Sequence, residues 1–459
     1  MTQKPKKSRV DAGSDQPQAG DDSLATSSQD QLPPEVIMLI VEDFDAAEDE
    51  ERELLMNMAL VSKLWCQVAQ ARLFAAIQID SADTCEYWSK KFEASPHLGR
   101  YVRKLVLTDD STRTPYLRSP AASILASACC NVRRVEMDDI QHWGPVEQAL
   151  IKSLQSMAEL RVVGIPEMSR ASDLPDLVYN LPNLIQLAVG DIGSYWDYID
   201  PSMNECGLSL RKQCPKDGKP KQIRHLIFLD SDVSRDMFMW MTGPAFDHSK
   251  LEHVSISWDY ISDIEERLHQ PDLAALADFL HAVGPQLRTL FLGIPTLPRT
   301  FSHDNPYVIP NEYDVLYKYL LSSKILSHLR NLRVFSIYMT PSEDSVLPLG
   351  ISCTAALLKT LTAPFLERIE LEATLVAPIL YELETICEGR AEWKSLDEIL
   401  SGNTFPLLKT LVLEIDFSIY RLKAQWLKYV VTESRIHSAI KKWSLPRTAA
   451  KGLLEIDVY

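Results

Sequence analysis

The sequence predicts an α/β chain in which a small helical module precedes a long array of stacked helix–strand units. Two observations predict the array: a short apolar phrase recurs along residues 80–459, and segments with helical spacing of apolar residues separate its copies. A third observation sets the module apart, because residues 31–79 follow a different, mainly helical pattern. The expected architecture is one curved, mostly parallel sheet with one face exposed and helices packed on the opposite face.

The phrase consists of an apolar residue, two variable residues, a second apolar residue, one variable residue and a third apolar residue. Successive copies start 24 to 45 residues apart. The ten copies are Val102-Leu105-Leu107, Val132-Val135-Met137, Leu160-Val163-Ile165, Leu184-Leu187-Val189, Ile223-Leu226-Phe228, Leu251-Val254-Ile256, Leu287-Leu290-Leu292, Leu332-Phe335-Ile337, Leu366-Ile369-Leu371 and Leu408-Leu411-Leu413.

The phrase fits a strand that is buried on one face. Side chains alternate between the two faces of a strand, so the second and third apolar positions point the same way, and only stacked neighbours bury them. The residues between them are expected on the exposed face; they include Lys104, Arg134, Gln186, His225, His253 and Arg368. Helices are expected at 147–158, 271–283, 311–328 and 420–442.

The array is similar to leucine-rich repeats in pattern, with one departure. Those repeats place an Asn three residues after the last apolar position, and no copy here does so. Six copies have Asp, Ser or Thr at that position: Asp110, Ser231, Asp259, Thr340, Thr374 and Asp416. The others have Ile140, Met168, Ile192 and Pro295. An irregular solenoid is therefore expected, and an ordinary α/β domain is the alternative.

The helical module begins with Leu32-Pro33-Pro34-Glu35 and continues into an apolar helix. Proline is tolerated at a helix start, where its missing N–H costs nothing. A carboxylate-rich connector, Asp43–Glu53, leads to a second helical stretch with Leu60-Val61-Ser62-Lys63-Leu64-Trp65. The segment ends on Arg72-Leu73-Phe74 and the strand-like Ile77–Ile79. A unit this small buries little surface alone, so its spare apolar area suits a partner.

This order and spacing resemble the F-box of fungal type, which attaches substrate receptors to a Skp-type adaptor in cullin-RING ubiquitin ligases. A generic helical hairpin is the alternative. The resemblance implies an F-box domain at 31–79 and a Skp-type adaptor as partner, with a cullin scaffold beyond it. The adaptor-binding residues that it implies are Leu32, Pro33, Glu35, Val36, Ile37, Ile40, Leu60, Val61 and Trp65.

Composition excludes several other classes of protein. The net charge of −16 argues against a nucleic-acid-binding protein, because phosphate contacts need a basic face. No apolar run is long enough to span a membrane, and the eight cysteines form no regular framework, so a reduced intracellular protein, cytoplasmic or nuclear, is expected. Residues 1–30 are polar and expected to be disordered. Lys4–Arg9 is either a nuclear import signal or a solvated basic tip.

Motifs for chemistry or metals are weak. A calcium loop starting at Asp43 fails, because Glu48 and Leu54 stand where Gly and Glu are needed. Cys206, Cys214 and His225 lack a fourth zinc ligand, and Cys129-Cys130 is read as packing. No phosphate loop, dinucleotide fingerprint or nucleophile elbow is present in the sequence. No catalytic residue, metal or cofactor is therefore expected.

The sequence therefore predicts a non-catalytic receptor subunit that holds a protein substrate on its repeats. Substrate contacts are expected late in the array, where aromatic, arginine and acidic residues occupy exposed positions. They are Phe291, Arg333, Tyr338, Arg368, Glu370, Glu372 and Glu414. Two alternatives stay open: an interaction scaffold without a ligase role, and an enzyme whose dispersed site the sequence does not reveal.

Overall fold

The computed structural model describes residues 32–44, 46, 48–108, 116–165, 173–190, 219–229, 235–257, 270–294, 319–339, 346–374, 391–416, 437–438 and 440–458. The chain divides into two compact units, Met1–Ala69 and Gln70–Tyr459, and each is described by itself. The expected disordered tail, the basic segment Lys4–Arg9 and most of the helix expected at 420–442 lie outside the described residues.

The first unit contains helices α1 (Pro34–Glu42), α2 (Asp49–Met58) and most of α3 (Lys63–Leu73). Pro34 occupies the first turn of α1, and three carboxylates occupy the first turn of α2, where the helix dipole favours negative charge. Ile37, Val41, Leu55 and Ala69 are its buried apolar residues. With so few buried side chains, the unit keeps many of its apolar residues at the surface.

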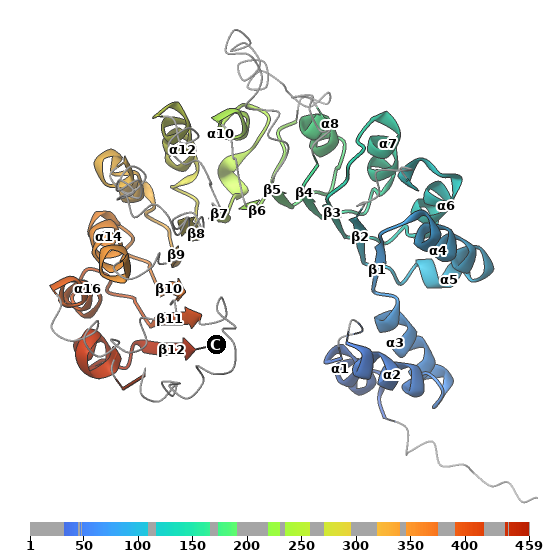
Figure 1. The fold of residues 1–459 in the computed structure, drawn as a ribbon, viewed down its shortest axis with the longest axis horizontal. Coiled ribbons are helices and arrows are strands. Elements are labelled where there is room, and N and C mark those ends of the chain that lie inside the picture. The colour runs from blue at the N-terminus through green and yellow to red at the C-terminus, as the bar shows by residue number, and fades with distance from the viewer. Residues whose placement is uncertain are drawn as a thin grey trace, which may run out of the picture. The chain divides into compact units, whose positions relative to one another are not determined.

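The second unit is built on one sheet of twelve strands in sequence order, and every neighbouring pair is parallel. The sheet is curved and does not close, since β1 and β12 are not paired (Figure 1). The strands are β1 (Ala76–Ile79), β2 (Lys104–Thr108), β3 (Arg134–Asp138), β4 (Glu159–Val163), β5 (Gln186–Gly190), β6 (His225–Leu229), β7 (His253–Ser257), β8 (Thr289–Ile294), β9 (Val334–Met339), β10 (Arg368–Thr374), β11 (Thr410–Asp416) and β12 (Leu454–Val458).

Helices connect the strands and lie on the outer side of the curve (Figure 1). This confirms the expected solenoid of parallel strands with helices on the other side. The α-helices are α4 (Ala82–Ala94), α5 (Pro96–Gly99), α6 (Pro120–Ala128), α7 (Pro145–Ser153), α8 (Asp173–Tyr179), α10 (Arg235–Met241), α12 (Gln270–Val283), α14 (Val346–Thr360), α16 (Ala391–Ser401) and α18 (Pro446–Ala450). Short helical turns are η2 (Tyr116–Arg118), η4 (His248–Lys250), η5 (Ile325–His328) and η8 (Ile440–Ser444).

Nine of the ten phrases have the predicted register, and the third is wrong by three residues. Val135 pairs with Leu160 and Met137 with Val162, so Met157, Leu160 and Val162 fill the three apolar positions of that repeat. The sequence allowed both registers, because Leu160, Val163 and Ile165 have the same spacing as Met157, Leu160 and Val162, displaced by three residues. Pairing with the previous strand decides between the two registers.

Two strands extend the array beyond the ten phrases. Ile77–Ile79 is a strand, as expected, and it pairs with β2 as the first strand of the sheet. Phe74, Ile77 and Ile79 in fact make a complete phrase that the sequence analysis assigned to the helical module. The last strand, β12, was missed because Lys451 stands where its first apolar residue would be.

The core lies between the sheet and its helices. Leu105, Leu187, Leu290, Ile369 and Leu411 are buried, as expected. Lys104, Gln186, Thr289 and Thr410, one position earlier on the strands, are half-buried, and Arg368 is exposed. Each repeat thus buries the apolar positions of its phrase and presents the intervening residues on the other face, which we call the strand face.

Side-chain amides tie neighbouring repeats together just before the strands. Asn131 Nδ2 donates to Arg100 O at 2.9 Å, Asn183 Nδ2 to Gln155 O at 2.8 Å, and Asn331 Nδ2 to Pro285 O at 2.5 Å. Each Asn directly precedes the first apolar residue of its phrase. The polar ladder of this array therefore lies at the strand start, whereas the sequence analysis searched for it after the strand.

Candidate functional site

The first unit presents an apolar surface. Thirteen large apolar side chains are exposed among the residues that the structure describes, and eight of them lie between Leu32 and Val61. We call these eight the apolar patch: Leu32, Val36, Met38, Leu39, Leu54, Met56, Leu60 and Val61. Exposed apolar groups in such numbers on so small a unit make this segment a candidate interaction surface.

The patch is most open at the turn between α2 and α3. Leu60 is 85% exposed and Val61 is 67% exposed. The backbone turns here because Leu60 N donates to Asn57 O and Val61 N to Met58 O, at 3.0 and 3.1 Å. Ser62 Oγ then accepts from Trp65 N at 3.3 Å, which caps the start of α3. A capped turn holds two apolar side chains in water, where a partner can cover them.

The residues that the F-box resemblance implies divide into two groups. Leu32, Pro33, Glu35, Val36, Leu60 and Val61 are exposed and open to a partner. Ile37 is buried, and Ile40 and Trp65 are half-buried, so these three also pack within the chain.

The strand face of the second unit changes in character along the array. On β2 to β4 it carries ion pairs: Glu136 Oε2 lies 2.9 Å from Lys104 Nζ, and Glu136 Oε1 lies 2.5 Å from an Arg134 guanidinium nitrogen. Burial alone would raise the pKa of Glu136. The hydrogen bond from Lys104 and the positive charge of Arg134 together lower it by more, so the net shift of the Glu136 pKa is downward. Burial also raises the pKa of the nearby Asp138. The charge of Arg161, whose Nε lies 3.6 Å from Asp138 Oδ1, offsets only part of this rise. On β2 to β4, the acidic side chains of the strand face are therefore paired with basic side chains of the same face.

The middle of the strand face, on β5 to β9, carries no charged residue at its outward positions. His225 and His253 stack there on neighbouring strands, with ring centroids 5.7 Å apart. Burial, and then the neighbouring His225, lower the pKa of His253. The lowered pKa favours the neutral imidazole of His253, and none of the outward residues on β5 to β9 is Asp, Glu, Lys or Arg.

The last part of the strand face, on β10 to β12, is acidic. Six of the predicted substrate-binding residues share the strand face: Phe291, Tyr338, Arg368, Glu370, Glu372 and Glu414. Arg333 does not join them, because it precedes β9 at the strand start and pairs with Glu367 at 3.4 Å. Arg368 Nε donates to Glu370 Oε1 at 2.6 Å, and Ser336 Oγ also donates to Glu370.

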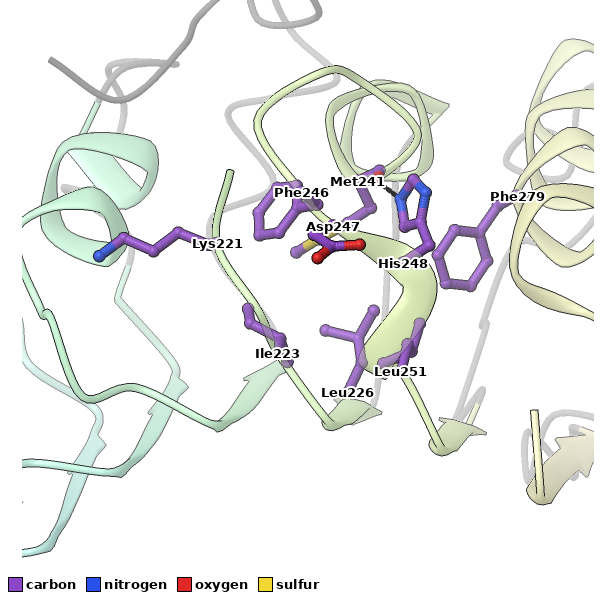
Figure 2. Close-up of a pocket in the computed structure, with 9 residues that line it drawn as sticks. All are labelled: Lys221, Ile223, Leu226, Met241, Phe246, Asp247, His248, Leu251 and Phe279. Atoms are coloured by element: carbon purple, nitrogen blue, oxygen red, sulfur yellow. Dashed lines mark hydrogen bonds between the residues drawn. The ribbon is translucent and has the colours of Figure 1, made fainter. Parts of the chain in front are cut away.

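The cavity drawn in Figure 2 lies on the helix side of the sheet, among β6, α10, η4 and α12. Ile223, Leu226, Met241 and Phe279 line it, and His248 Nε2 lies 2.5 Å from the carbonyl oxygen of Met241. Its volume of ≈ 10 Å³ holds about one water. We interpret this cavity as a packing gap between neighbouring repeats, which is too small for a substrate or cofactor.

No group of three or more His, Cys, Asp or Glu side chains that could hold a metal occurs in the described part of the chain. Cys206 and Cys214 lie outside it. Cys129 is fully buried, and burial raises the pKa of its thiol to about 12. That thiol is therefore protonated and inert, which agrees with its interpretation as a packing residue. The same interpretation is wrong for Cys130, because its side chain is exposed. Within the described ranges, none of the helices combines the length and the apolar character needed to cross a bilayer.

No protein-family model matches the chain, and no curated protein matches it. Among solved structures, a chain from the crystal structure of the Rad7 and Elc1 complex in yeast is similar to it, with 12% sequence identity and a TM-score of 0.33. The alignment covers 85% of this chain and 91% of that chain. A likeness this weak supports neither the fold nor a function, which rest here on the chain's own residues.

Proposed function

We propose that this chain is the substrate-recognition subunit of a Skp–cullin–F-box ubiquitin ligase. The observation that carries the proposal is the apolar patch, which lies in the same segment whose sequence resembles the F-box. Leu32, Val36, Leu60 and Val61 belong both to the patch and to the residues that the resemblance implies for adaptor binding.

In the proposed complex, the apolar patch docks on a Skp-type adaptor. The apolar residues of α1 and of the α2–α3 turn pack against adaptor helices, which is how amphipathic helices are recognised. Burying an apolar side chain contributes roughly 0.8 kcal/mol per methylene. Leu60 and Val61 are the most exposed members of the patch, so docking can cover the largest fraction of their surface.

The strand face holds the substrate in this proposal, and no residue of the chain performs chemistry. Holding a substrate lysine near a ubiquitin thioester turns a bimolecular encounter into a local one, and that proximity is the contribution of a receptor subunit.

The test measures binding of a purified Skp-type adaptor to the full chain and to a Leu60→Ala/Val61→Ala variant. The variant removes side-chain carbons that docking would bury. Counting about 0.8 kcal/mol for each carbon and multiplying by the exposed fraction of its side chain gives a loss of about 3 kcal/mol of binding free energy, so we expect roughly a hundredfold weaker binding. The fold should change little, because both side chains are largely in water.

The control is Phe365→Ala/Leu407→Ala, which removes two exposed apolar side chains, 50% and 48% exposed, from the turns before β10 and β11. It should bind the adaptor as the wild type does. If wild-type chain and adaptor do not associate, or if both double variants weaken binding equally, the F-box proposal fails.

A further inference from the structure

Arginines recur at the point where the chain enters each strand. We call the residue immediately before each of the strands β2 to β11 its entry residue. The entry residues form one continuous row, because the backbone N–H of each donates to the carbonyl oxygen of the previous one at 2.7 to 2.9 Å. In chain order, the row consists of Arg103, Arg133, Ala158, Ile185, Arg224, Glu252, Arg288, Arg333, Glu367 and Lys409.

Carboxylates accompany the cations in the later part of the row. Glu252 Oε1 lies 3.8 Å from Arg288 Nη1 on the next strand. Glu367 pairs with the entry residues on both sides of it, Arg333 at 3.4 Å and Lys409 at 2.5 Å. Each cation that enters a strand from β6 to β11 therefore has a Glu as its neighbour in the row.

The first two entry residues are arginines without such a neighbour. Arg103 and Arg133 are adjacent and exposed, and the next two members of the row, Ala158 and Ile185, carry no charge. Arg100, three residues before Arg103, is exposed as well. Among the described residues, no carboxylate forms an ion pair with any of these three arginines, which we call the arginine cluster.

The surroundings of the arginine cluster do not neutralise it. Glu136 and Glu159, on the neighbouring strands β3 and β4, both pair with Arg134 instead, at 2.5 and 3.7 Å. The segments that lead into β2 and β3, residues 95–103 and 129–133, contain no Asp or Glu. In a chain of net charge −16, the cluster is therefore a local excess of positive charge.

Asn131 connects the members of the arginine cluster. Its Nδ2 donates to Arg100 O at 2.9 Å, and Arg103 Nη1 donates to Asn131 O at 3.3 Å. The guanidinium of Arg103 thus reaches the segment that carries Arg133, two residues after Asn131. A guanidinium has several N–H donors in a planar fork, so the one hydrogen bond to Asn131 leaves most of the donors of Arg103 open to a partner.

We infer that the arginine cluster binds a segment of another protein that carries Asp or Glu side chains. A guanidinium donates two parallel hydrogen bonds to a carboxylate, and Arg103 and Arg133 enter adjacent strands about 4.8 Å apart, so one segment can engage both. A polynucleotide fits less well, because a phosphate backbone needs a more extended basic face than three arginines provide. This inference goes beyond the proposed function, since the cluster includes no residue of the apolar patch or of the predicted substrate contacts.

The experiment compares two selections from one random display library of peptides of about 12 residues. The full chain is immobilised in one selection and its Arg103→Gln/Arg133→Gln variant in the other. Peptides that bind elsewhere, such as on the apolar patch, are recovered in both. We expect some peptides to be recovered on the wild-type chain alone, and we expect these to be rich in Asp and Glu. No adaptor is present, so this experiment and the adaptor experiment fail separately.

One such peptide is then synthesised with a fluorescent label, and its affinity is measured by anisotropy at low salt. Arg103→Gln/Arg133→Gln should weaken binding roughly tenfold or more, because two charge-assisted pairs are lost. Arg103→Lys/Arg133→Lys keeps the charge but not the planar fork, so it should weaken binding to a smaller extent. The control, Arg224→Gln/Arg288→Gln, removes two exposed arginines from the same row, makes the same change in net charge and should leave the affinity unchanged. Circular dichroism checks that every variant is folded.

The inference is overturned if both selections recover the same peptides, if the peptides lost on the variant lack Asp and Glu, or if the control pair weakens binding as much as the Arg103/Arg133 pair. It is also overturned if a labelled single-stranded oligonucleotide binds the wild-type chain more tightly than the peptide does and loses that affinity in Arg103→Gln/Arg133→Gln, because the cluster would then be a nucleic-acid site.

Discussion

Asp397 is a buried carboxylate in α16 that holds the last helix of the array, and replacing it with alanine is expected to release the C-terminal repeat. Its side chain is 3% exposed. Oδ1 accepts from Thr448 N at 2.9 Å and from Thr448 Oγ1 at 2.7 Å, and Oδ2 accepts from Arg447 N at 3.1 Å. Asp397 thereby caps α18 from a neighbouring helix, and α18 leads directly into β12.

The magnitude follows from the groups left behind. The alanine variant leaves two backbone N–H groups and one buried hydroxyl without an acceptor, at about 1–3 kcal/mol for each buried group. Water that reaches Arg447, which is partly exposed, reduces the total, so we expect a loss of about 3 kcal/mol. Asp397→Asn keeps one carbonyl oxygen and should lose about half of that.

The loss should be local, because each repeat of a solenoid contacts only its neighbours. Hydrogen exchange is the assay: amides of residues 446–458 should exchange much faster in Asp397→Ala, and those of β2 to β8 should not change. Asp278→Ala, an exposed carboxylate on α12, is the control. Wild-type protection of β12 in Asp397→Ala would refute the capping argument, and uniform loss across the sheet would refute its locality.

Three further predictions concern the strand face. The lowered pKa of Glu136 means that its contribution to stability is complete above pH 4.5 and is lost as the pH falls through the folded-state pKa, so acid titration of the unfolding free energy should be flatter in Glu136→Gln. The lowered pKa of His253 means that the unfolded chain binds that proton more readily, so stability should fall as the pH drops below 6.5, and less so in His253→Gln. Gly190→Ala should destabilise by roughly 1–3 kcal/mol in chemical denaturation, because its Cβ would lie 2.4 Å from Leu229 O.

The apolar phrase was sufficient to predict the sheet, because a strand that is buried on one face has apolar residues at alternate positions of its sequence. It predicted the order and direction of the strands and the burial of Leu105, Leu290 and Ile369. It failed where a second reading of the spacing existed, at Leu160, and where a charged residue broke the phrase, at Lys451. Pairing with a neighbour, which a single repeat does not contain, decides such cases.

The functional surfaces were only partly predictable. Exposed positions followed from strand alternation, so Phe291, Tyr338 and Glu372 were correctly placed on one face. Which residues become neighbours on that face depends on the register between repeats that start 24 to 45 residues apart. The sharing of Glu136 by Lys104 and Arg134 and the stacking of His225 on His253 therefore emerged only from the structure. So did the extent of the strand face on β5 to β9 that carries no Asp, Glu, Lys or Arg.

Assembly with an adaptor and a cullin tests the receptor role most directly. Purified chain, Skp-type adaptor and cullin are mixed, and the mass of the product is measured by light scattering during size-exclusion chromatography. The account predicts a complex with one copy of each protein, which the Leu60→Ala/Val61→Ala variant does not form and the Phe365→Ala/Leu407→Ala control does. A complex of chain and adaptor that excludes the cullin would identify a scaffold without a ligase role, and a chain that elutes alone would contradict the account.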